Sequence, residues 1–344
     1  MKEIRVLVAE DSSTTRDHLV HLIEDAPELR VVETASDGAE AVEKAVRSRP
    51  DVILMDVHMP HVDGLTATRR IMEQAPTPIV LMSASLECAE VALTFEALDA
   101  GAVTIVRKPP GLGDPRQAEA VGEFLQTLRL MAEVKVVRRW SRREAVPPVE
   151  PRHRNHVSVI AIGASTGGPP VLAELLRDLP RGFGAPILVV QHIASGFTEG
   201  LVEWLMGQTA LTVTLARDGE PVRPGSAYVA PEGRQMEVGP DGRVRLTAEV
   251  GRDGFRPSVS HTFASLAATH GRSVMGILLT GMGRDGAAGL LRLREAGAVT
   301  VAQSEATSVV FGMPGEAVRM QAAQHVLSPG EIAGLMRALA GVEP

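Results

Sequence analysis

The chain has 344 residues, 44% of them hydrophobic and 22% charged, which is the balance of a soluble globular protein long enough for two domains. A formal net charge of -7 argues against nucleic-acid binding, which needs clustered positive charge. With Cys88 as the only cysteine and no apolar run near the ~18 residues of a membrane span, we expect a cytoplasmic protein without disulfides or direct membrane insertion.

The first half of the chain alternates short β-branched runs with stretches of helical periodicity. Strands are predicted at residues 4–9, 31–34, 52–55, 79–82 and 103–106. Residues 39–48 have the pattern of an amphipathic helix, and a last helix is predicted over about 115–134. Strands that alternate with helices are typical of a parallel, doubly wound α/β sheet. We assign residues 1–125 to this first domain.

Residues 126–156 are expected to finish the last helix and then to form a linker. From residue 135 onward this segment carries six arginines and three prolines, with almost no apolar periodicity. That composition favours a solvated, semi-extended linker. A docking segment for an acidic partner is the alternative, and the sequence leaves both interpretations open.

The second half, residues 157–344, begins a new alternation and predicts a second α/β domain with a mainly parallel sheet. Its strands are predicted at 157–162, 187–190, 226–229, 274–280 and 299–302. Helical patterns cover residues 171–179 and 260–268. A Gly-Pro-Asp-Gly turn at 239–242 between two short β-like runs predicts a hairpin.

Acidic residues follow two predicted strands of the first domain. Glu10 and Asp11 follow the first strand, and Asp56 ends the third. The carboxyl ends of parallel strands meet at one edge, where three carboxylates repel one another unless a cation lies between them. Oxygen ligands of this kind suit Mg²⁺. Asp56 could then accept a phosphoryl group, which Ser83 and Lys108 from the next two strand ends would contact.

The run from Asp56 to Leu65 and the segment from Ala102 to Pro109 resemble the receiver domain of response regulators. The resemblance covers about residues 1–125. It implies a flavodoxin-like fold, phosphorylation at Asp56, and phosphoryl contacts from Ser83 and Lys108. The metal site that it implies is formed by Glu10, Asp11, Asp56 and the backbone carbonyl of His58.

Two positions depart from the receiver pattern. Glu10 replaces the commoner Asp, which is a tolerated variant, and Ile105 occupies a switch position that is often aromatic. His58 and His61 stand three residues apart beside a proline, so we interpret them as loop residues and not as a zinc pair.

A serine lies in a glycine-rich turn at the start of the second domain. Residues 163–167 read G-x-S-x-G with Ser165 at the centre, between a predicted strand and a predicted helix. Small flanking residues allow a tight turn that exposes the hydroxyl, and backbone N–H groups beside it could hold an oxyanion. A phosphate-binding glycine turn would use the same backbone groups and is the competing interpretation.

Two further strand ends favour acyl transfer. His192 follows the strand at 187–190, and Asp285 follows the strand at 274–280. In a parallel sheet these residues emerge at the same edge as Ser165 and form the minimum set of nucleophile, base and orienting carboxylate. The chain order Ser, His, Asp differs from that of α/β-hydrolases. His261 and His270 are alternative bases, which we interpret as structural or surface residues.

Four segments of the second half resemble the catalytic domain of the chemotaxis methylesterase family, CheB. They are residues 162–169, 190–192, 279–286 and 302–314. The resemblance implies a Rossmann-like domain without a cofactor, with Ser165 as nucleophile, His192 as general base and Asp285 as its orienter. It also implies oxyanion support from Thr166 and from the Met282 backbone N–H. Ser260 stands where the family usually has an acidic residue.

Together the two resemblances imply a phosphorylation-activated protein-glutamate methylesterase. It would hydrolyse glutamate γ-methyl esters on cytoplasmic helices of methyl-accepting chemoreceptors, release methanol, and also deamidate glutamine. A sensor histidine kinase of the CheA type would phosphorylate it, and the unphosphorylated receiver would cover the triad. The alternatives are a receiver-controlled serine hydrolase of another ester or amide and a catalytically silent signalling module. A DNA-binding response regulator is disfavoured, because the second half has no helix-turn-helix pattern and the chain is acidic.

Overall fold

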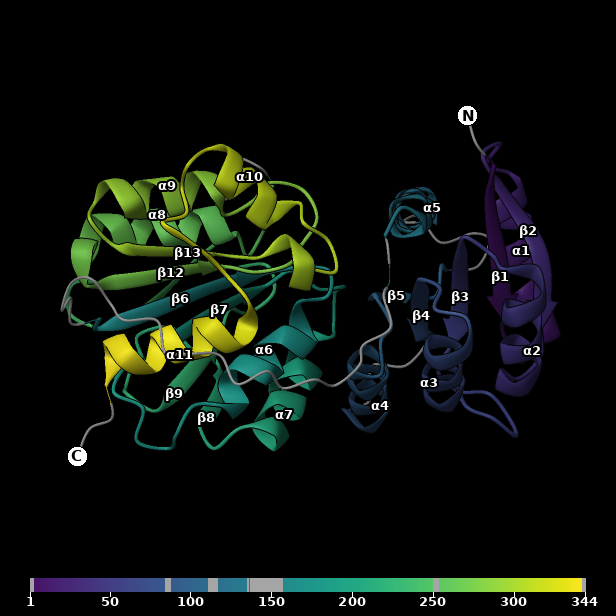
Figure 1. The fold of residues 1–344 in the computed structure, drawn as a ribbon, viewed down its shortest axis with the longest axis horizontal. Coiled ribbons are helices and arrows are strands. Elements are labelled where there is room, and N and C mark those ends of the chain that lie inside the picture. The colour runs from purple at the N-terminus through teal and green to yellow at the C-terminus, as the bar shows by residue number, and fades with distance from the viewer. Residues whose placement is uncertain are drawn as a thin grey trace. The chain divides into compact units, whose positions relative to one another are not determined.

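The computed structural model describes residues 3–83, 88–110, 117–134, 136, 157–249 and 254–341 (Figure 1). The chain divides into two compact units, Met1–Arg142 and Arg143–Pro344. Nearly all of the arginine- and proline-rich segment predicted as a linker lies outside the described residues. Within the described residues, no helix has the length and apolar character needed to cross a membrane.

The first unit contains a five-stranded parallel sheet, as the sequence predicts. Its strands are β1 (Ile4–Ala9), β2 (Leu29–Ala35), β3 (Val52–Asp56), β4 (Ile79–Ser83) and β5 (Thr104–Arg107). Their order in the sheet is β2-β1-β3-β4-β5. All residues of β3 and β4 are buried, which explains why these strands read as continuous apolar runs and not as alternating ones.

Helices connect these strands and cover both faces of the sheet. They are α1 (Ser13–Glu24), α2 (Gly38–Ser48), α3 (Gly64–Gln74), α4 (Cys88–Asp99) and α5 (Gln117–Ala132). Ser12, Asp37 and Asp63 cap the first three helices by accepting a backbone N–H of the first turn. In Figure 1, α5 lies on one face of the sheet and α3 and α4 lie on the other.

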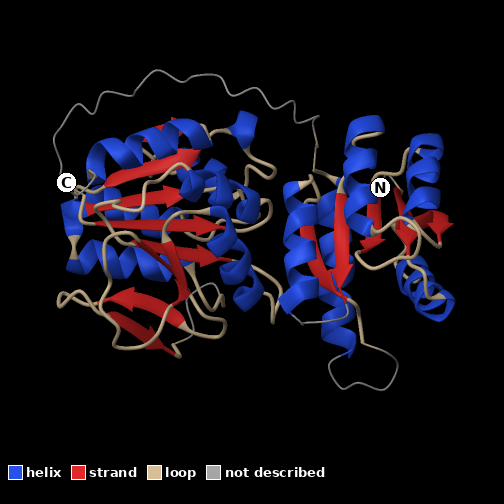
Figure 2. Cartoon of the chain, turned by 90° about the horizontal axis from the view of Figure 1, so that it is seen from below, coloured by secondary structure: helices blue, strands red, loops and turns tan. Residues whose placement is uncertain are grey.

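The second unit is built on a seven-stranded sheet in which every pairing is parallel. Its strands are β6 (Val159–Ala164), β7 (Ile187–Gln191), β8 (Thr212–Leu215), β9 (Ser226–Val229), β12 (Val274–Leu278), β13 (Val299–Gln303) and β14 (His325–Leu327). The order is β14-β13-β12-β6-β7-β9-β8. The predicted hairpin forms a separate antiparallel pair of β10 (Gln235–Val238) and β11 (Val244–Thr247), visible beside the main sheet in Figure 2.

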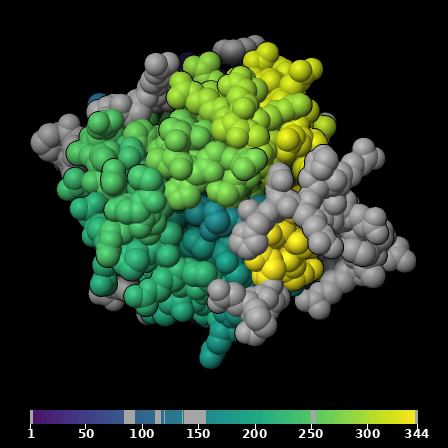
Figure 3. Space-filling model, turned by 90° about the vertical axis from the view of Figure 1, so that its left-hand side faces the viewer, coloured from purple at the N-terminus to yellow at the C-terminus, as the bar shows by residue number. Residues whose placement is uncertain are grey.

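Two layers of helices enclose this sheet. They are α6 (Gly168–Arg177), α7 (Thr198–Gln208), α8 (Val259–Thr269), α9 (Ala287–Glu295), α10 (Met313–Arg319) and α11 (Pro329–Ala340). In Figure 1, α8, α9 and α10 lie on one face and α6, α7 and α11 on the other. Figure 3 shows one face of this unit, on which the teal segment that begins it lies between green and yellow segments from later in the chain.

The strand order reverses once in each sheet. In the first unit the chain departs in opposite directions from β1 and β3, and in the second unit from β6 and β12. Such a switch point leaves a crevice beyond the carboxyl ends of the two strands, because the helices that follow them lie on opposite faces. Each crevice is therefore the expected ligand site of its unit.

Candidate active site and acidic pocket

Ser165 lies directly after β6, in the turn that leads into α6. Its backbone N–H donates to the carbonyl of Thr280 at 3.0 Å, and its own carbonyl accepts the N–H of Gly168 at 2.8 Å. Gly167 completes the turn with φ +75°, which a residue with a side chain rarely adopts. The turn is thus fixed to the loop after β12 and leaves the serine half-buried.

That loop approaches Ser165 more closely than a side chain would permit. A Cβ atom on Gly281 would lie 2.7 Å from Cβ of Ser165 and 2.4 Å from Sδ of Met313. Glycine at this position therefore allows the two crevice loops to pack against each other. Met282, predicted as the backbone oxyanion donor, follows Gly281 directly, so it lies beside the serine turn.

His192 follows β7, and its N–H donates to the carbonyl of Ala164 at 2.9 Å. This bond places the histidine beside the end of β6. Its side chain is 14% exposed, and Nε2 lies 3.0 Å from Oδ2 of Asp285, off the line of the ring N–H. The structure therefore brings His192 and Asp285 into direct contact, as predicted. Because Asp285 contacts Nε2, Nδ1 is the ring nitrogen that remains for a proton from the serine.

Asp285 is buried, with 2% of its surface exposed, and several donors surround it. Oδ1 accepts the hydroxyl of Ser258 at 3.1 Å and the N–H groups of Ser260 at 3.0 Å and Gly286 at 2.8 Å. Oδ2 accepts the N–H of Val259 at 2.8 Å. Burial alone would raise the pKa of this carboxyl, but its contacts with His192 and Ser260 outweigh burial and lower the pKa below its usual value.

Ser260, which stands where the family usually has an acidic residue, belongs to this network. Its backbone donates to Asp285, and its hydroxyl accepts the N–H of Gly286 at 2.7 Å. His261 faces a different partner, because its Nε2 lies 2.5 Å from Oε1 of Glu237. It is therefore engaged on the β10 side, in agreement with its interpretation as a structural residue.

Three buried polar side chains support the site, although no role was predicted for them. Gln191 donates to the carbonyl of Ser165 at 2.8 Å, and Gln303 accepts the N–H of Thr280 at 2.7 Å. Thr280 in turn donates its hydroxyl to the carbonyl of Thr166 at 2.9 Å. Each of the three residues stands at or near the end of an apolar strand. A polar residue directly after an apolar run in the sequence is the signal that could have identified them.

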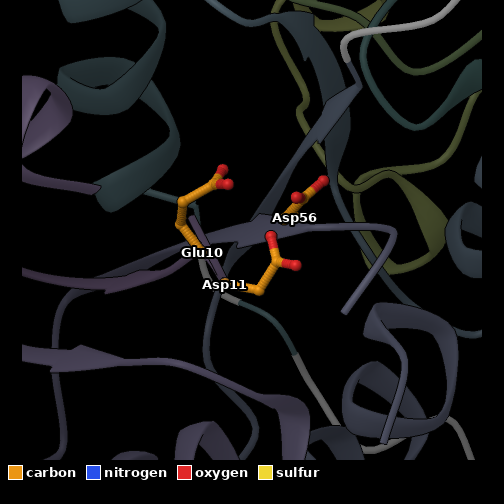
Figure 4. A group of neighbouring side chains, drawn as sticks. All are labelled: Glu10, Asp11 and Asp56. Atoms are coloured by element: carbon orange, nitrogen blue, oxygen red, sulfur yellow. The ribbon is translucent and has the colours of Figure 1, made fainter. Parts of the chain in front are cut away.

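The acidic pocket of the first unit gathers the three predicted carboxylates. Figure 4 shows the side chains of Glu10, Asp11 and Asp56 grouped together, and one oxygen from each lies within 4.8 Å of the others. Glu10 is 1% and Asp56 4% exposed, whereas Asp11 is exposed. The strand ends of β1 and β3 therefore meet at the switch point, as the parallel sheet requires.

Lys108 is the cation of this pocket. Its Nζ lies 2.7 Å from Oδ2 of Asp56 and 2.8 Å from Oε2 of Glu10. Burial alone would lower the pKa of Lys108, but these two contacts outweigh it and raise the pKa. Burial raises the pKa of the Glu10 carboxyl, and its contacts with Lys108 and Ser12 offset that effect only in part.

A divalent cation fits this arrangement. Oε2 of Glu10 is buried and lacks a well-aligned hydrogen bond, and the set of donors consists of oxygen atoms alone. Oxygen donors of this kind are the ligands that Mg²⁺ binds in proteins. The pocket therefore has the chemistry expected of a magnesium site.

The remaining predicted receiver residues lie around the pocket. Ser83 is buried at the end of β4, and its carbonyl accepts the N–H of Lys108 at 3.2 Å. The N–H of His58 lies 3.4 Å from Oδ1 of Asp56, which places this backbone beside the acids. Ile105 is buried with 5% exposure, and His61 is an exposed loop residue. Phosphoryl contact by Ser83 and metal binding by the His58 carbonyl stay predictions.

The fold and the two sites define a class of protein in which a receiver-type acidic pocket and a Ser-His-Asp constellation share one chain. A family model described as CheB methylesterase matches residues 160–336, and one described as response regulator receiver domain matches residues 6–118. The chain belongs to the CheB methylesterase family and carries a receiver domain.

Curated relatives extend over nearly the whole chain. The protein-glutamate methylesterase/protein-glutamine glutaminase 4 of Geobacter metallireducens is 47% identical, over 98% of this chain and 99% of its own. The enzyme of the same name numbered 1 from Syntrophus aciditrophicus is 45% identical, again over 98% and 99%. The solved catalytic domain of Thermotoga maritima CheB methylesterase is 36% identical, with a TM-score of 0.51, over 52% of this chain and 97% of its own.

Proposed function

We propose that this protein hydrolyses the γ-methyl esters of glutamate side chains on chemoreceptors and deamidates glutamine side chains by the same route. The observation that carries the proposal is the convergence of three strand ends. Ser165, His192 and Asp285 follow β6, β7 and β12, and the histidine lies 3.0 Å from the buried aspartate. The names of relatives that match the chain over almost its full length indicate the substrate class.

In the first half-reaction, Oγ of Ser165 attacks the ester carbonyl. His192 takes the hydroxyl proton, and because Asp285 engages Nε2, the nitrogen that receives the proton is Nδ1. The ionised carboxylate stabilises the imidazolium that forms. His192 then gives the proton to the departing methoxy oxygen, and methanol leaves an acyl-serine behind.

In the second half-reaction, water attacks the acyl-serine. His192 removes a proton from the water and returns it to Oγ of Ser165, so that a glutamate carboxylate and free enzyme result. With a primary amide in place of the ester, ammonia leaves instead of methanol. We assign support of the oxyanion to the serine turn at Thr166 and to the N–H of Met282, which flank the serine.

Regulation belongs to the first unit. We assign Asp56 as the residue that accepts a phosphoryl group from a sensor histidine kinase, with Ser83 and Lys108 as its polar neighbours. Glu10, Asp11, Asp56 and the carbonyl of His58 would hold Mg²⁺, which when bound supplies positive charge to offset the phosphoryl oxygens. Phosphorylation at Asp56 then raises the activity of the second unit.

The nucleophile is tested directly by Ser165→Ala. Loss of the serine from such a triad lowers turnover by roughly 10⁶-fold, because the residual rate comes from binding and the oxyanion site alone. Methanol release from methylated receptor membranes should therefore fall to background. A variant that keeps more than a tenth of wild-type turnover would refute the assignment.

The competing functions predict different results in the same assay. A hydrolase of another ester would label at Ser165 with a fluorophosphonate but release no methanol from receptors. A catalytically silent module would do neither. Both measurements on one preparation therefore separate the three possibilities.

A further inference from the structure

The aromatic ring of Phe255 lies flat against the ring of His192. The ring centroids are 4.6 Å apart and the planes differ by 10°. Phe255 is nevertheless 47% exposed, so burial in the core does not explain its place. An exposed aromatic ring stacked on the base of a Ser-His-Asp constellation points to a role at that site.

A buried glutamine holds Phe255 in place. Gln235 on β10 is fully buried, and its Nε2 donates to the carbonyl of Phe255 at 2.8 Å. Its Oε1 accepts the N–H of Ser258 at 2.8 Å. The hydroxyl of Ser258 in turn donates to Asp285 at 3.1 Å. One short segment therefore carries both the ring that stacks on His192 and a donor to the carboxylate that contacts the same imidazole.

The stacking supplies a restraint that the carboxylate alone does not. A contact at Nε2 fixes one atom of the imidazole, while rotation about the side-chain bonds can still move the opposite nitrogen. A parallel ring on one face opposes that rotation. The π face of a phenyl ring also attracts a cation, which the imidazole becomes while His192 holds the serine proton.

On the basis of the proposed hydrolase function, we propose that Phe255 is a positioning residue for His192. Its ring holds the imidazole with Nδ1 toward Ser165 and stabilises the imidazolium during both half-reactions. This role affects the chemical step and not the binding of substrate. Removal of the ring should consequently lower kcat and leave KM unchanged.

The test compares Phe255→Leu with Phe255→Tyr in the full-length chain. Leucine keeps an apolar side chain but removes the ring, whereas tyrosine keeps the ring. We expect Phe255→Leu to lower kcat for methanol release roughly tenfold with KM unchanged, and Phe255→Tyr to keep kcat within about twofold. Val326→Ala is the matched control, because Val326 is also 47% exposed and lies on the edge strand β14.

The rate of fluorophosphonate labelling at Ser165 provides a readout that does not depend on the receptor. Labelling should slow in Phe255→Leu by about the same factor as kcat. Equal labelling and kcat in the leucine and tyrosine variants, or a rise in KM alone, would overturn the role of Phe255. Wild-type protein that does not label at Ser165 would overturn the proposed hydrolase itself, so the two failures are distinguishable.

Discussion

At the scale of single residues, the sequence predicts the groups that we propose carry the chemistry but not the groups that position them. Ser165, His192 and Asp285 stand at strand ends, and a parallel sheet brings such ends to one edge. Gln235 and Phe255 were not predicted, because their contacts join residues about 20 to 60 positions apart in the chain. The hydrophobic periodicity of a sequence indicates helices and strands but not contacts between such distant residues. The role of a buried polar residue depends on its hydrogen-bond partners, which only the folded structure shows.

Asp285 gives a prediction for both rate and stability. Asp285→Asn should lower kcat by roughly 10⁴-fold, because the amide cannot stabilise the imidazolium and favours the wrong tautomer. It should also lower the free energy of unfolding of the second unit at pH 7 by about 2 kcal/mol, because donors that now bond to a carboxylate would face a neutral amide.

The stability effect has a defined dependence on pH. Folding lowers the pKa of Asp285 from its ordinary 3.8, so the folded state binds this proton less tightly than the unfolded state. The stabilisation is therefore complete above about pH 5 and is lost progressively as the pH falls through 3.8 toward the lower folded pKa. Wild type and Asp285→Asn should differ most at pH 5–7 and converge below pH 4.

Tryptophan fluorescence can measure unfolding of the second unit specifically. Trp204 on α7 is buried, and Trp140→Phe would leave it as the only tryptophan of the chain. Urea unfolding of this background, with and without Asp285→Asn, measures the difference at each pH. A difference that stays constant from pH 7 to pH 3 would contradict the assignment of the ionised carboxylate as the stabilising form.

At the scale of elements, the predicted central strands are confirmed, and the edge strands of the second sheet were missed. Strands β8 and β14 have four and three residues, and most of their side chains are half-buried or exposed. Edge strands are short and mixed in composition, so they lack the continuous apolar run that marks buried parallel strands. The predicted strand at 274–280 ends at Leu278, because Thr280 turns away to bond with the serine turn.

The packing of the loop after β12 on the serine turn is tested by Gly281→Ala. The added methyl group would lie 2.7 Å from Cβ of Ser165, so one of the two loops must move. Because the geometry of the nucleophile is then disturbed, kcat should fall by about 100-fold. Gly334→Ala on α11 is the control, because nothing beyond its own stretch of helix lies within 4 Å of the new methyl group and activity should stay at the wild-type level. Equal kcat for the two variants would contradict this account of the turn.

At the scale of the whole molecule, two α/β units each place their polar residues at the switch point of a parallel sheet. The sequence predicts this arrangement for both units, because the residues that break the apolar strands are the same residues that meet in the crevice. The joining segment could not be interpreted in the same way. Its arginines and prolines carry no periodicity, so its composition alone favours a linker.

The central claim is that a serine esterase in the second unit responds to phosphorylation of Asp56 in the first. The most direct test is methanol release from methylated receptor membranes by the full chain in Mg²⁺, with and without a small-molecule phosphodonor. We predict that release rises with the phosphodonor in wild type, keeps its basal rate but does not rise in Asp56→Asn, and is absent in Ser165→Ala. Chelation of Mg²⁺ should remove the rise but not the basal rate. A stimulated rate in Asp56→Asn equal to that of wild type, or no release by folded wild-type protein, would contradict the account.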